Sequence, residues 1–232
     1  MNRFNLPPFD GDQSFEGQAA MTISRDQFIV WIKDFAGVIA ENKEYLTGLD
    51  SAIGDADHGI NMDRGFQAVL TKLPAFANQD IGSIAKNIGM VLISTVGGAS
   101  GPLYGTLFMQ IGKETAGKLE LTLNDWTAAI DSAVNGVMMR GKANLGDKTM
   151  LDTLIPALNT LKECVADGTS LTEALKASEK TAEQGMLSTI PLVAKKGRAS
   201  YLGERSAGTQ DPGATSSYFL LKTAVHALSS SA

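Results

Sequence analysis

The stretch that decides the fold reads SRDQFIVWIKDFAGVI and covers residues 24–39. Its large apolar residues recur every three or four positions, as they do on one face of an α-helix. These residues are Phe28, Trp31, Ile32, Phe35, Val38 and Ile39. Ser24 followed by Gln27 is typical of a capping box, in which each side chain accepts a hydrogen bond from the backbone of the other residue. The stretch therefore predicts an amphipathic helix that opens at Ser24 and runs to about residue 44.

The same helical period continues along nearly the whole chain. Further helices are expected near residues 60–72, 81–95, 102–116, 122–139, 149–164, 170–186, 187–196 and 213–229. We find no convincing alternating strand pattern, and glycine residues cluster at the junctions. Because short connections make neighbouring helices pack antiparallel, we expect an all-α fold, a barrel or bundle of about eight amphipathic helices.

Composition narrows the class of protein further. The chain has 232 residues, of which 44% are hydrophobic, and a net charge of −5. This supports a sizeable core and leaves no basic footprint for nucleic acid. The single cysteine, Cys164, excludes an internal disulfide, fits a reducing cytoplasm and is expected to be a structural residue of a helix. No apolar run approaches the ~20 residues that a membrane-spanning helix needs.

The first twenty residues differ from the rest because they have no helical period. We expect residues 1–20 to be a leader or a disordered extension, with Met21 as the natural start. Residues 21–232 would then form a single domain.

An acidic cluster is the first candidate site. Asp50, Asp55 and Asp57 lie within eight residues of one another, and carboxylates this close repel unless a cation lies between them. Mg²⁺ prefers oxygen ligands and commonly binds one or two carboxylates together with substrate phosphates. An EF-hand is excluded, because Gly59 and Phe66 stand where that loop needs acidic ligands. A solvated, helix-capping turn explains the cluster equally well on its own.

Two junctions contain features that suit an anion. Residues 94–103 read STVGGASGPL, in which small residues let backbone N–H groups approach a phosphate, and Pro102 suits the first turn of a helix. A close helix crossing through small residues is the alternative there. At residues 209–215, Asp211 is expected to cap a helix that begins at Pro212, and Gly213 lets a flat ligand come close. A plain capped helix is the alternative for this junction.

Two further junctions carry basic residues. In residues 195–206, Arg198 or Arg205 can bind a phosphate with two hydrogen bonds, whereas a solvated basic loop is the alternative. Residues 140–150 look like a phosphate loop but lack its Gly-Lys-Ser/Thr ending, so we interpret Met150 there as an apolar wall for a base.

The histidines receive different interpretations. His58 directly follows the acidic cluster, and a ligand-facing role is favoured over a structural one. His226, in the last predicted helix, is expected to be structural.

The five polar, glycine-rich junctions are residues 54–59, 97–102, 141–149, 195–206 and 208–215. In an up-and-down bundle, alternate junctions share an end. We therefore expect these five to converge on one rim.

Taken in order, these motifs resemble those of the ADP-binding L subunit family of bacterial dihydroxyacetone kinase, also called the DhaL type. The matching stretches are YLTGLD (45–50), IGDADHG (53–59), GGASGPLYG (97–105), GDKTM (146–150), KGRASYLGERS (196–206) and DPGATS (211–216). The resemblance runs from about Met21 to the C-terminus.

The resemblance implies a barrel of eight antiparallel helices with the nucleotide on one rim. It implies that Asp50, Asp55 and Asp57 hold two Mg²⁺ ions and act in catalysis together with Arg198. The nucleotide contacts that it implies are His58, Gly59, Ile60, Asn61, Ala99, Ser100, Gly141, Met150, Arg198, Asp211, Pro212 and Gly213.

The family also implies a reaction. ADP stays bound as a cofactor and is phosphorylated by a phosphohistidine carrier of the sugar phosphotransferase system, subunit M. The γ-phosphate then passes to dihydroxyacetone, which is held covalently by a histidine of subunit K. Phosphoryl transfer needs positioning and charge neutralisation more than covalent chemistry by the protein. The implied protein is thus a cytoplasmic subunit of a phosphoenolpyruvate-dependent glycerone kinase, with a homodimer expected.

Two alternatives stay open. Relatives that act as ATP-dependent glycerone kinases usually join K-like and L-like halves in one longer chain, and 232 residues leave no room for a K-like half. L subunits can also contact a transcriptional regulator, so a nucleotide-sensing regulatory protein is the other alternative. A purely regulatory protein can lose its metal ligands, yet all three aspartates are present.

Overall fold

A computed structural model describes residues 22–228, and α-helices make up most of them. They are α1 (Arg25–Glu41), α2 (Lys43–Ile53), α3 (His58–Lys72), α4 (Ile81–Thr95), α5 (Ser100–Glu114), α6 (Leu123–Gly141), α7 (Leu151–Ala166), α8 (Leu171–Ser188) and α9 (Pro212–Leu228). Two 3₁₀ segments, η1 (Leu73–Ala75) and η2 (Arg198–Ser206), and two short strands, β1 (Ile23–Ser24) and β2 (Glu120–Leu121), complete the elements. The extension expected at residues 1–20 lies outside the described residues.

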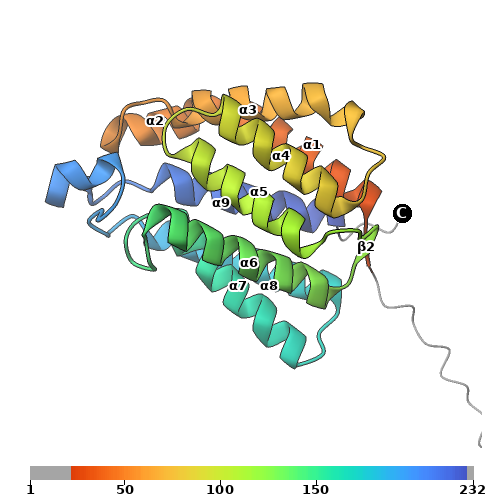
Figure 1. Cartoon of the computed structure of the whole chain (residues 1–232). Helices are drawn as coiled ribbons and strands as arrows, with labels where there is room; N and C mark the ends of the chain where they lie inside the picture. The colour runs from red at the N-terminus through yellow and green to blue at the C-terminus, as the bar shows by residue number, and fades with distance from the viewer. Residues whose placement is uncertain (1–21, 229–232) are drawn as a thin grey trace, which may run out of the picture.

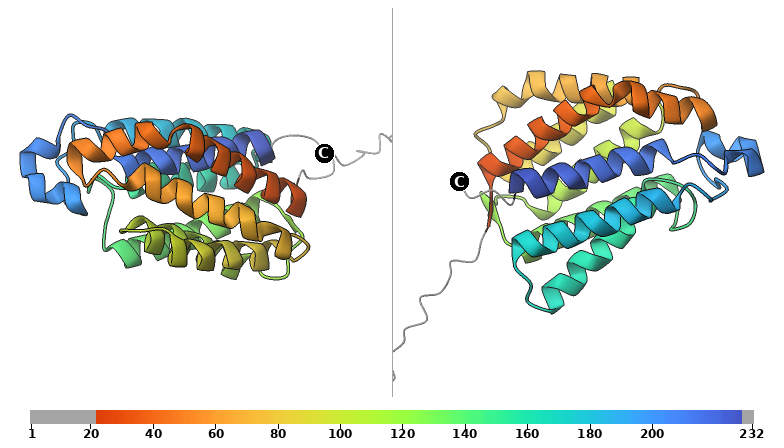
Figure 2. Two further views of the ribbon diagram at one scale, coloured as in Figure 1. Left: turned by 90° about the horizontal axis from the view of Figure 1, so that it is seen from above. Right: turned by 180° about the vertical axis from the view of Figure 1, so that it is seen from behind.

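The helices form a closed antiparallel barrel (Figures 1 and 2). From α3 to α9, each helix packs against the next along the chain. The first and last helices close the ring, because both α1 and α2 contact α3 on one side and α9 on the other. Since α1 and α2 share one place in the ring, the barrel has eight positions among the described residues. The predicted all-α barrel of about eight helices is confirmed.

Aromatic side chains of α1 fill the centre of the barrel. The ring of Trp31 lies 5.2 Å from that of Phe28, 5.2 Å from that of Trp126 and 6.0 Å from that of Phe108, measured between centroids. The indole Nε1 of Trp31 donates to the Leu220 carbonyl of α9 at 2.8 Å, so this buried polar group is satisfied. The apolar stripe predicted from sequence is thus the core-facing side of α1.

The start of α1 is as predicted, but its end is not. Ser24 Oγ accepts from the Gln27 N–H at 3.2 Å, and Gln27 Oε1 accepts from the Ser24 N–H at 2.8 Å, which completes the capping box. The helix then ends at Glu41, and the backbone of Asn42 leaves the helical conformation. The backbone N–H of Asn42, at 3.0 Å, and its side-chain amide, at 2.8 Å, both donate to the Val38 carbonyl. The chain bends there, and a second helix, α2, carries it to the acidic cluster.

The helix expected at residues 187–196 is absent from this described segment. Helix α8 continues to Ser188, and turns follow. Pro191 lacks a backbone N–H and disfavours a helical conformation at Ile190. The 3₁₀ segment η2 forms instead a few residues later.

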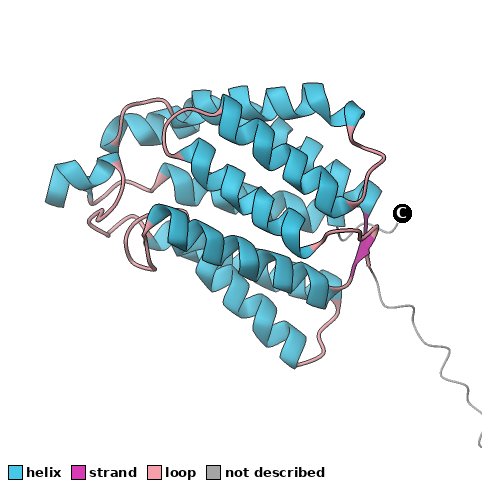
Figure 3. Cartoon of the chain, viewed as in Figure 1, coloured by secondary structure: helices cyan, strands magenta, loops and turns pink. Residues whose placement is uncertain are grey.

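The two strands were also missed. They pair antiparallel, with Ile23 opposite Leu121, at the end of the barrel away from η2 (Figure 3). Two residues per strand are too few to show an alternating pattern. None of the helices between residues 22 and 228 combines the length and the hydropathy that a membrane span requires.

Candidate functional site

The five glycine-rich junctions meet around one cleft with a volume of about 480 Å³. It lies at the end of the barrel where α2 and η2 project in Figure 1. Helices α3, α5, α7 and α9 all begin at its walls, where His58, Ser100, Leu151 and Pro212 stand. Helix N-termini offer free backbone N–H groups and a positive dipole end, which favour anions. The predicted convergence of the junctions on one rim is confirmed.

The acidic cluster lies at one side of this cleft. Asp50 is in the last turn of α2, only 8% exposed, and its Oδ2 accepts the backbone N–H groups of Asp57 at 2.8 Å and His58 at 3.1 Å. Asp50 therefore caps α3 from the neighbouring helix, while Asp57 makes no side-chain cap bond. The capping alternative accounts for Asp50 but not for the carboxylates of Asp55 and Asp57.

The three carboxylates fit a divalent cation. One oxygen of each lies within 4.8 Å of the others. Mg²⁺ binds oxygen at about 2.0–2.1 Å, so two ligands of one ion lie up to ~4 Å apart, and small side-chain movements suffice. Ala56 has a positive φ of 60° and turns the chain between Asp55 and Asp57. This conformation is unfavourable for a residue other than glycine, and strain of this kind is common at functional sites.

Arg198 faces the acidic cluster from the first position of η2. Its Nε lies 2.8 Å from Asp55 Oδ2. Of the two arginines left open by the sequence, Arg198 lines the cleft and Arg205 does not. An ion pair this exposed contributes little to stability, about 0–1 kcal/mol, so the arginine is available to a ligand.

His58 connects three helices beneath the cleft. Its Nδ1 lies 3.0 Å from Ser100 Oγ of α5, and its Nε2 lies 2.9 Å from Ser216 Oγ of α9. Burial lowers the pKa of His58 to about 4, against the opposing effect of Asp50 and Asp57. Both ring nitrogens are engaged and the ring is neutral at pH 7, so His58 is better suited to holding the helices than to moving a proton.

Helix α9 begins as the sequence predicted. Asp211 Oδ2 accepts the Ala214 N–H at 2.7 Å, and Pro212 occupies the first helical position. Burial raises the pKa of Asp211 to about 7; the bond from Ala214 and the charge of Lys148 act in the opposite direction. A carboxylate with this pKa is partly protonated near neutral pH.

Apolar side chains form another part of the cleft wall. They are Ile53, Leu103, Val137, Ala143, Met150 and Leu151. Met150, which sequence analysis assigned to an apolar wall, is buried at the start of α7. Such a surface suits a flat, weakly polar ring, as ligand pockets commonly do.

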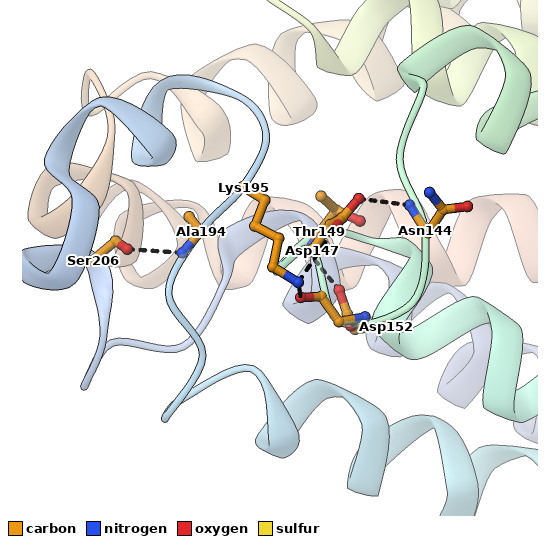
Figure 4. A network of polar contacts seen from close by, with 8 residues as sticks. Asn144, Asp147, Thr149, Asp152, Ala194, Lys195 and Ser206 are labelled. Atoms are coloured by element: carbon orange, nitrogen blue, oxygen red, sulfur yellow. Dashed lines mark hydrogen bonds and ion pairs between the residues drawn. The ribbon is translucent and has the colours of Figure 1, made fainter.

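The loop that resembles a phosphate loop is closed by its own carboxylates (Figure 4). Asp147 Oδ2 accepts the Asn144 N–H at 2.8 Å, and Asp152 accepts the N–H groups of Gly146 at 2.6 Å and Thr149 at 2.7 Å. The backbone donors that a phosphate loop offers to phosphate are therefore occupied by the chain itself. Lys195 reaches the same loop, with its Nζ 3.0 Å from the Gly146 carbonyl.

Most of the residues proposed from sequence line the cleft. They are Asp50, Asp55, Asp57, His58, Ala99, Ser100, Gly141, Met150, Arg198, Asp211, Pro212 and Gly213. Three do not. Gly59 packs so closely on α2 that a Cβ would overlap the Lys43 carbonyl, Ile60 is exposed, and the Asn61 side chain accepts from Arg64 at 2.7 Å. Contact of these three with a ligand stays a prediction.

Sequence reasoning missed the buried polar groups behind the cleft. Tyr104 OH lies 2.7 Å from Ser216 Oγ, and Lys148 is 1% exposed. The only signal for Lys148 was its place in the GDKTM motif, which does not show that a lysine turns inward.

The fold and the site together define a helical barrel with an oxygen-ligand cluster and helix N-termini on one rim. Residues 52–226 match the DAK2 domain family, and the chain belongs to that family. It is 49% identical over 202 residues to the PEP-dependent dihydroxyacetone kinase, ADP-binding subunit DhaL, of Escherichia coli, covering 87% of this chain and 96% of that protein. The corresponding PTS-dependent subunit of Lactococcus lactis is 41% identical over 198 residues, covering 85% of this chain and 95% of that protein. The resemblance found in the motifs is confirmed.

Solved structures support the fold. The crystal structure of the dihydroxyacetone kinase of C. freundii superposes with a TM-score of 0.67 at 21% identity, covering 97% of this chain. This chain spans 38% of the length of that solved chain. A second structure of that kinase, in complex with AMP-PNP and Mg²⁺, has a TM-score of 0.63 and 20% identity.

Proposed function

We propose that this chain is the ADP-binding phosphotransferase subunit of a phosphoenolpyruvate-dependent dihydroxyacetone kinase. The observation that carries the proposal is the cleft itself, where three carboxylates stand with four helix N-termini and an apolar wall. It combines partners for cations, phosphates and a base. Relatives that are named as ADP-binding subunits support the same assignment over nearly their whole length.

Within this proposal, Asp50, Asp55 and Asp57 hold two Mg²⁺ ions. When bound, these ions would neutralise charge on the phosphate oxygens. Gly54 supports the arrangement, because a Cβ there would overlap the Asp50 carboxylate. The starts of α5 and α9, with Ser100 and Gly213, would donate backbone N–H groups to phosphate, and the apolar wall with Met150 would hold the base.

His58 is not suited to act as a general base, because both of its ring nitrogens are engaged. We therefore assign to this chain the holding and relaying of a phosphoryl group. Arg198 would bind the phosphoryl group as it transfers. The phosphohistidine donor would belong to subunit M, and the acceptor dihydroxyacetone with its activating groups to subunit K.

The proposal extends to assembly and location. Residues 21–232 would form one nucleotide-binding domain, act in the cytoplasm and pair as a homodimer. Partner subunits K and M, and a transcriptional regulator as an additional partner, would approach the rim. The η2 segment projects there with Tyr201 88% exposed, which is suited to protein contact.

The test is native mass spectrometry of the purified protein, followed by transfer assays with subunits K and M. One ADP with two Mg²⁺ per chain, and phosphoryl transfer to dihydroxyacetone, are expected. Asp55→Asn should lose Mg²⁺-dependent ADP retention and transfer while its circular dichroism stays helical, and Asp167→Asn, at an exposed position after α7, is the matched control. Wild-type transfer by Asp55→Asn would refute the role of Asp55.

The same assay separates the alternatives. An ATP-dependent kinase would exchange bound ADP for free ATP and work without subunit M. A purely regulatory protein would bind nucleotide without turnover, and its capture of a regulator would change with ADP.

A further inference from the structure

Lys148 is a buried cation that the proposed function does not use. It has a positive φ of 60° and is 1% exposed at the floor of the cleft. Its Nζ donates to four backbone carbonyls, those of Thr209 at 2.6 Å, Thr189 at 2.8 Å, Leu192 at 3.1 Å and Ile190 at 3.4 Å. An ammonium has three protons, so the longest of these contacts is shared.

The four carbonyls belong to two separate stretches of the chain, residues 189–192 and Thr209. Three of them follow α8, and the fourth precedes the N-cap of α9. Two further hydrogen bonds join the same two stretches. The Gly208 N–H donates to the Ile190 carbonyl at 2.7 Å, and the Asp211 N–H donates to Thr189 Oγ1 at 3.0 Å. Lys148 thus joins the two stretches between which the segment 193–208 extends, and we call this junction the base of the segment.

The segment 193–208 carries the basic residues that reach the cleft. Lys196 and Arg198 line it, and Arg198 contacts Asp55 of the acidic cluster at 2.8 Å. Arg198 thus lies within the segment whose base Lys148 closes, and Lys195 also ties this segment to the Asp147 carbonyl at 3.1 Å. Within the segment, the Ala194 N–H donates to Ser206 Oγ at 2.9 Å, which links its two ends (Figure 4).

A lysine is well suited to this place. Its flexible stem crosses the apolar interior, and its three N–H groups donate to carbonyls on both sides of the segment at once. Burial lowers the pKa of Lys148, and the charges of Asp211 and Asp152 act against that change and favour the ammonium.

We propose that Lys148 is a positioning residue of the nucleotide site, which acts by holding the base of the segment 193–208 so that Arg198 meets the phosphates in a prepared geometry. This rests on the proposed function, since the ligand is taken to be Mg²⁺–ADP. Prepared geometry lowers the ordering cost of binding. Loss of this prepared geometry should appear as faster release of ADP, while the helical barrel stays folded.

The first measurement is hydrogen exchange of the wild-type protein without nucleotide. The Gly208 amide, which closes the base, should be protected at least a hundredfold. Exchange of this amide at the rate of an open chain would overturn the proposal. Because no nucleotide is present, this result does not depend on the proposed function. A wild-type protein with a protected Gly208 amide that never binds Mg²⁺–ADP would refute the proposed function, and with it the nucleotide as the ligand, but not the closure of the base by Lys148.

The second measurement compares Lys148→Met with wild type, and Lys148→Gln replaces it if the first variant does not fold. We expect the ADP dissociation rate and the exchange of the Gly208 and Asp211 amides to rise at least tenfold. The matched control is Ile84→Ala, a buried residue of α4 that does not line the cleft. It should lower the melting temperature with less than twofold change in ADP dissociation.

The third measurement places Lys148→Met in an Arg198→Ala background. If Lys148 acts through Arg198, its effect on ADP dissociation should shrink to less than threefold there. An undiminished effect would overturn the proposal, as would an equal rise in the Ile84→Ala control.

Discussion

Asp211 offers a test of the electrostatics at the cleft, through the substitution Asp211→Asn. Asparagine caps helices as well as aspartate does, so the Ala214 N–H keeps an acceptor while the buried charge is removed. In the wild type, burial raises the pKa of Asp211 from 3.8 to about 7. The unfolded chain therefore loses this proton at lower pH than the folded protein does.

The sign and size follow from proton linkage. A folded pKa above the unfolded one means that the native state binds more protons, so stability falls as pH rises through this window. One pKa unit corresponds to ~1.36 kcal/mol, so the shift from 3.8 to about 7 corresponds to about 4 kcal/mol in total. Roughly 2–3 kcal/mol of it falls between pH 5 and pH 8. The free energy of unfolding of the variant should therefore rise by roughly 2–3 kcal/mol relative to wild type between pH 5 and pH 8.

The assay is urea unfolding of ligand-free protein at pH 5, 6, 7 and 8 and constant ionic strength. Any unsatisfied amide in the variant shifts stability equally at each pH, so the slope of the difference against pH is the measured quantity. Asp167→Asn serves as the surface control, because this residue is exposed at the end of α7. A wild-type-to-variant difference that stays flat from pH 5 to pH 8 would refute the reasoning.

Two other substitutions test the same rim. Gly54→Ala should cost about 2–3 kcal/mol in urea unfolding, because its Cβ would displace the Asp50 carboxylate from the N–H groups that it accepts. Gly48→Ala, inside the preceding helix α2 with open space around it, should instead stabilise the protein by up to about 1 kcal/mol. Equal effects of the two alanines would contradict the overlap. His58→Gln tests the buried imidazole. Its folded pKa of about 4 lies below the ordinary histidine value of 6.5. The wild type therefore loses about 2 kcal/mol of stability between pH 7 and pH 5 as the unfolded state takes up the proton, and the variant should not. A wild-type acid sensitivity that persists in His58→Gln would assign it to other groups.

Local patterns in the sequence were sufficient for most of the helices and for two of their caps. The capping box at Ser24 and the cap at Asp211 involve residues only three positions apart, so the local sequence is enough to predict them. The junctions were found for the same reason, since glycine and proline act on the backbone next to them. The convergence of those junctions followed from antiparallel packing.

The predictions that the structure contradicts failed for a different reason, because they depend on contacts that the local pattern does not show. The chain bends at Asn42 although the apolar period continues, and there the backbone and side-chain N–H groups of Asn42 both donate to the Val38 carbonyl. After Ser188, carbonyls that a helix would have used turn to Lys148, whose side chain comes from more than forty residues earlier. Gly59, Ile60 and Asn61 follow the acidic cluster in sequence and lie outside the cleft walls, so their contact with a ligand stays a prediction.

The acidic cluster shows which properties of the site can be seen in the sequence and which depend on the tertiary structure. Its residue types and spacing are visible in the sequence and already indicate a cation, because carboxylates this close along the chain are also close in space, where they repel one another. The burial of Asp50 and its bonds to the start of α3 need a second helix to fold back. Contact with Arg198 needs the whole barrel to close. Chemistry that depends on neighbours in sequence is local, whereas burial, and with it the pKa values of His58 and Asp211, exists only once distant helices exclude water.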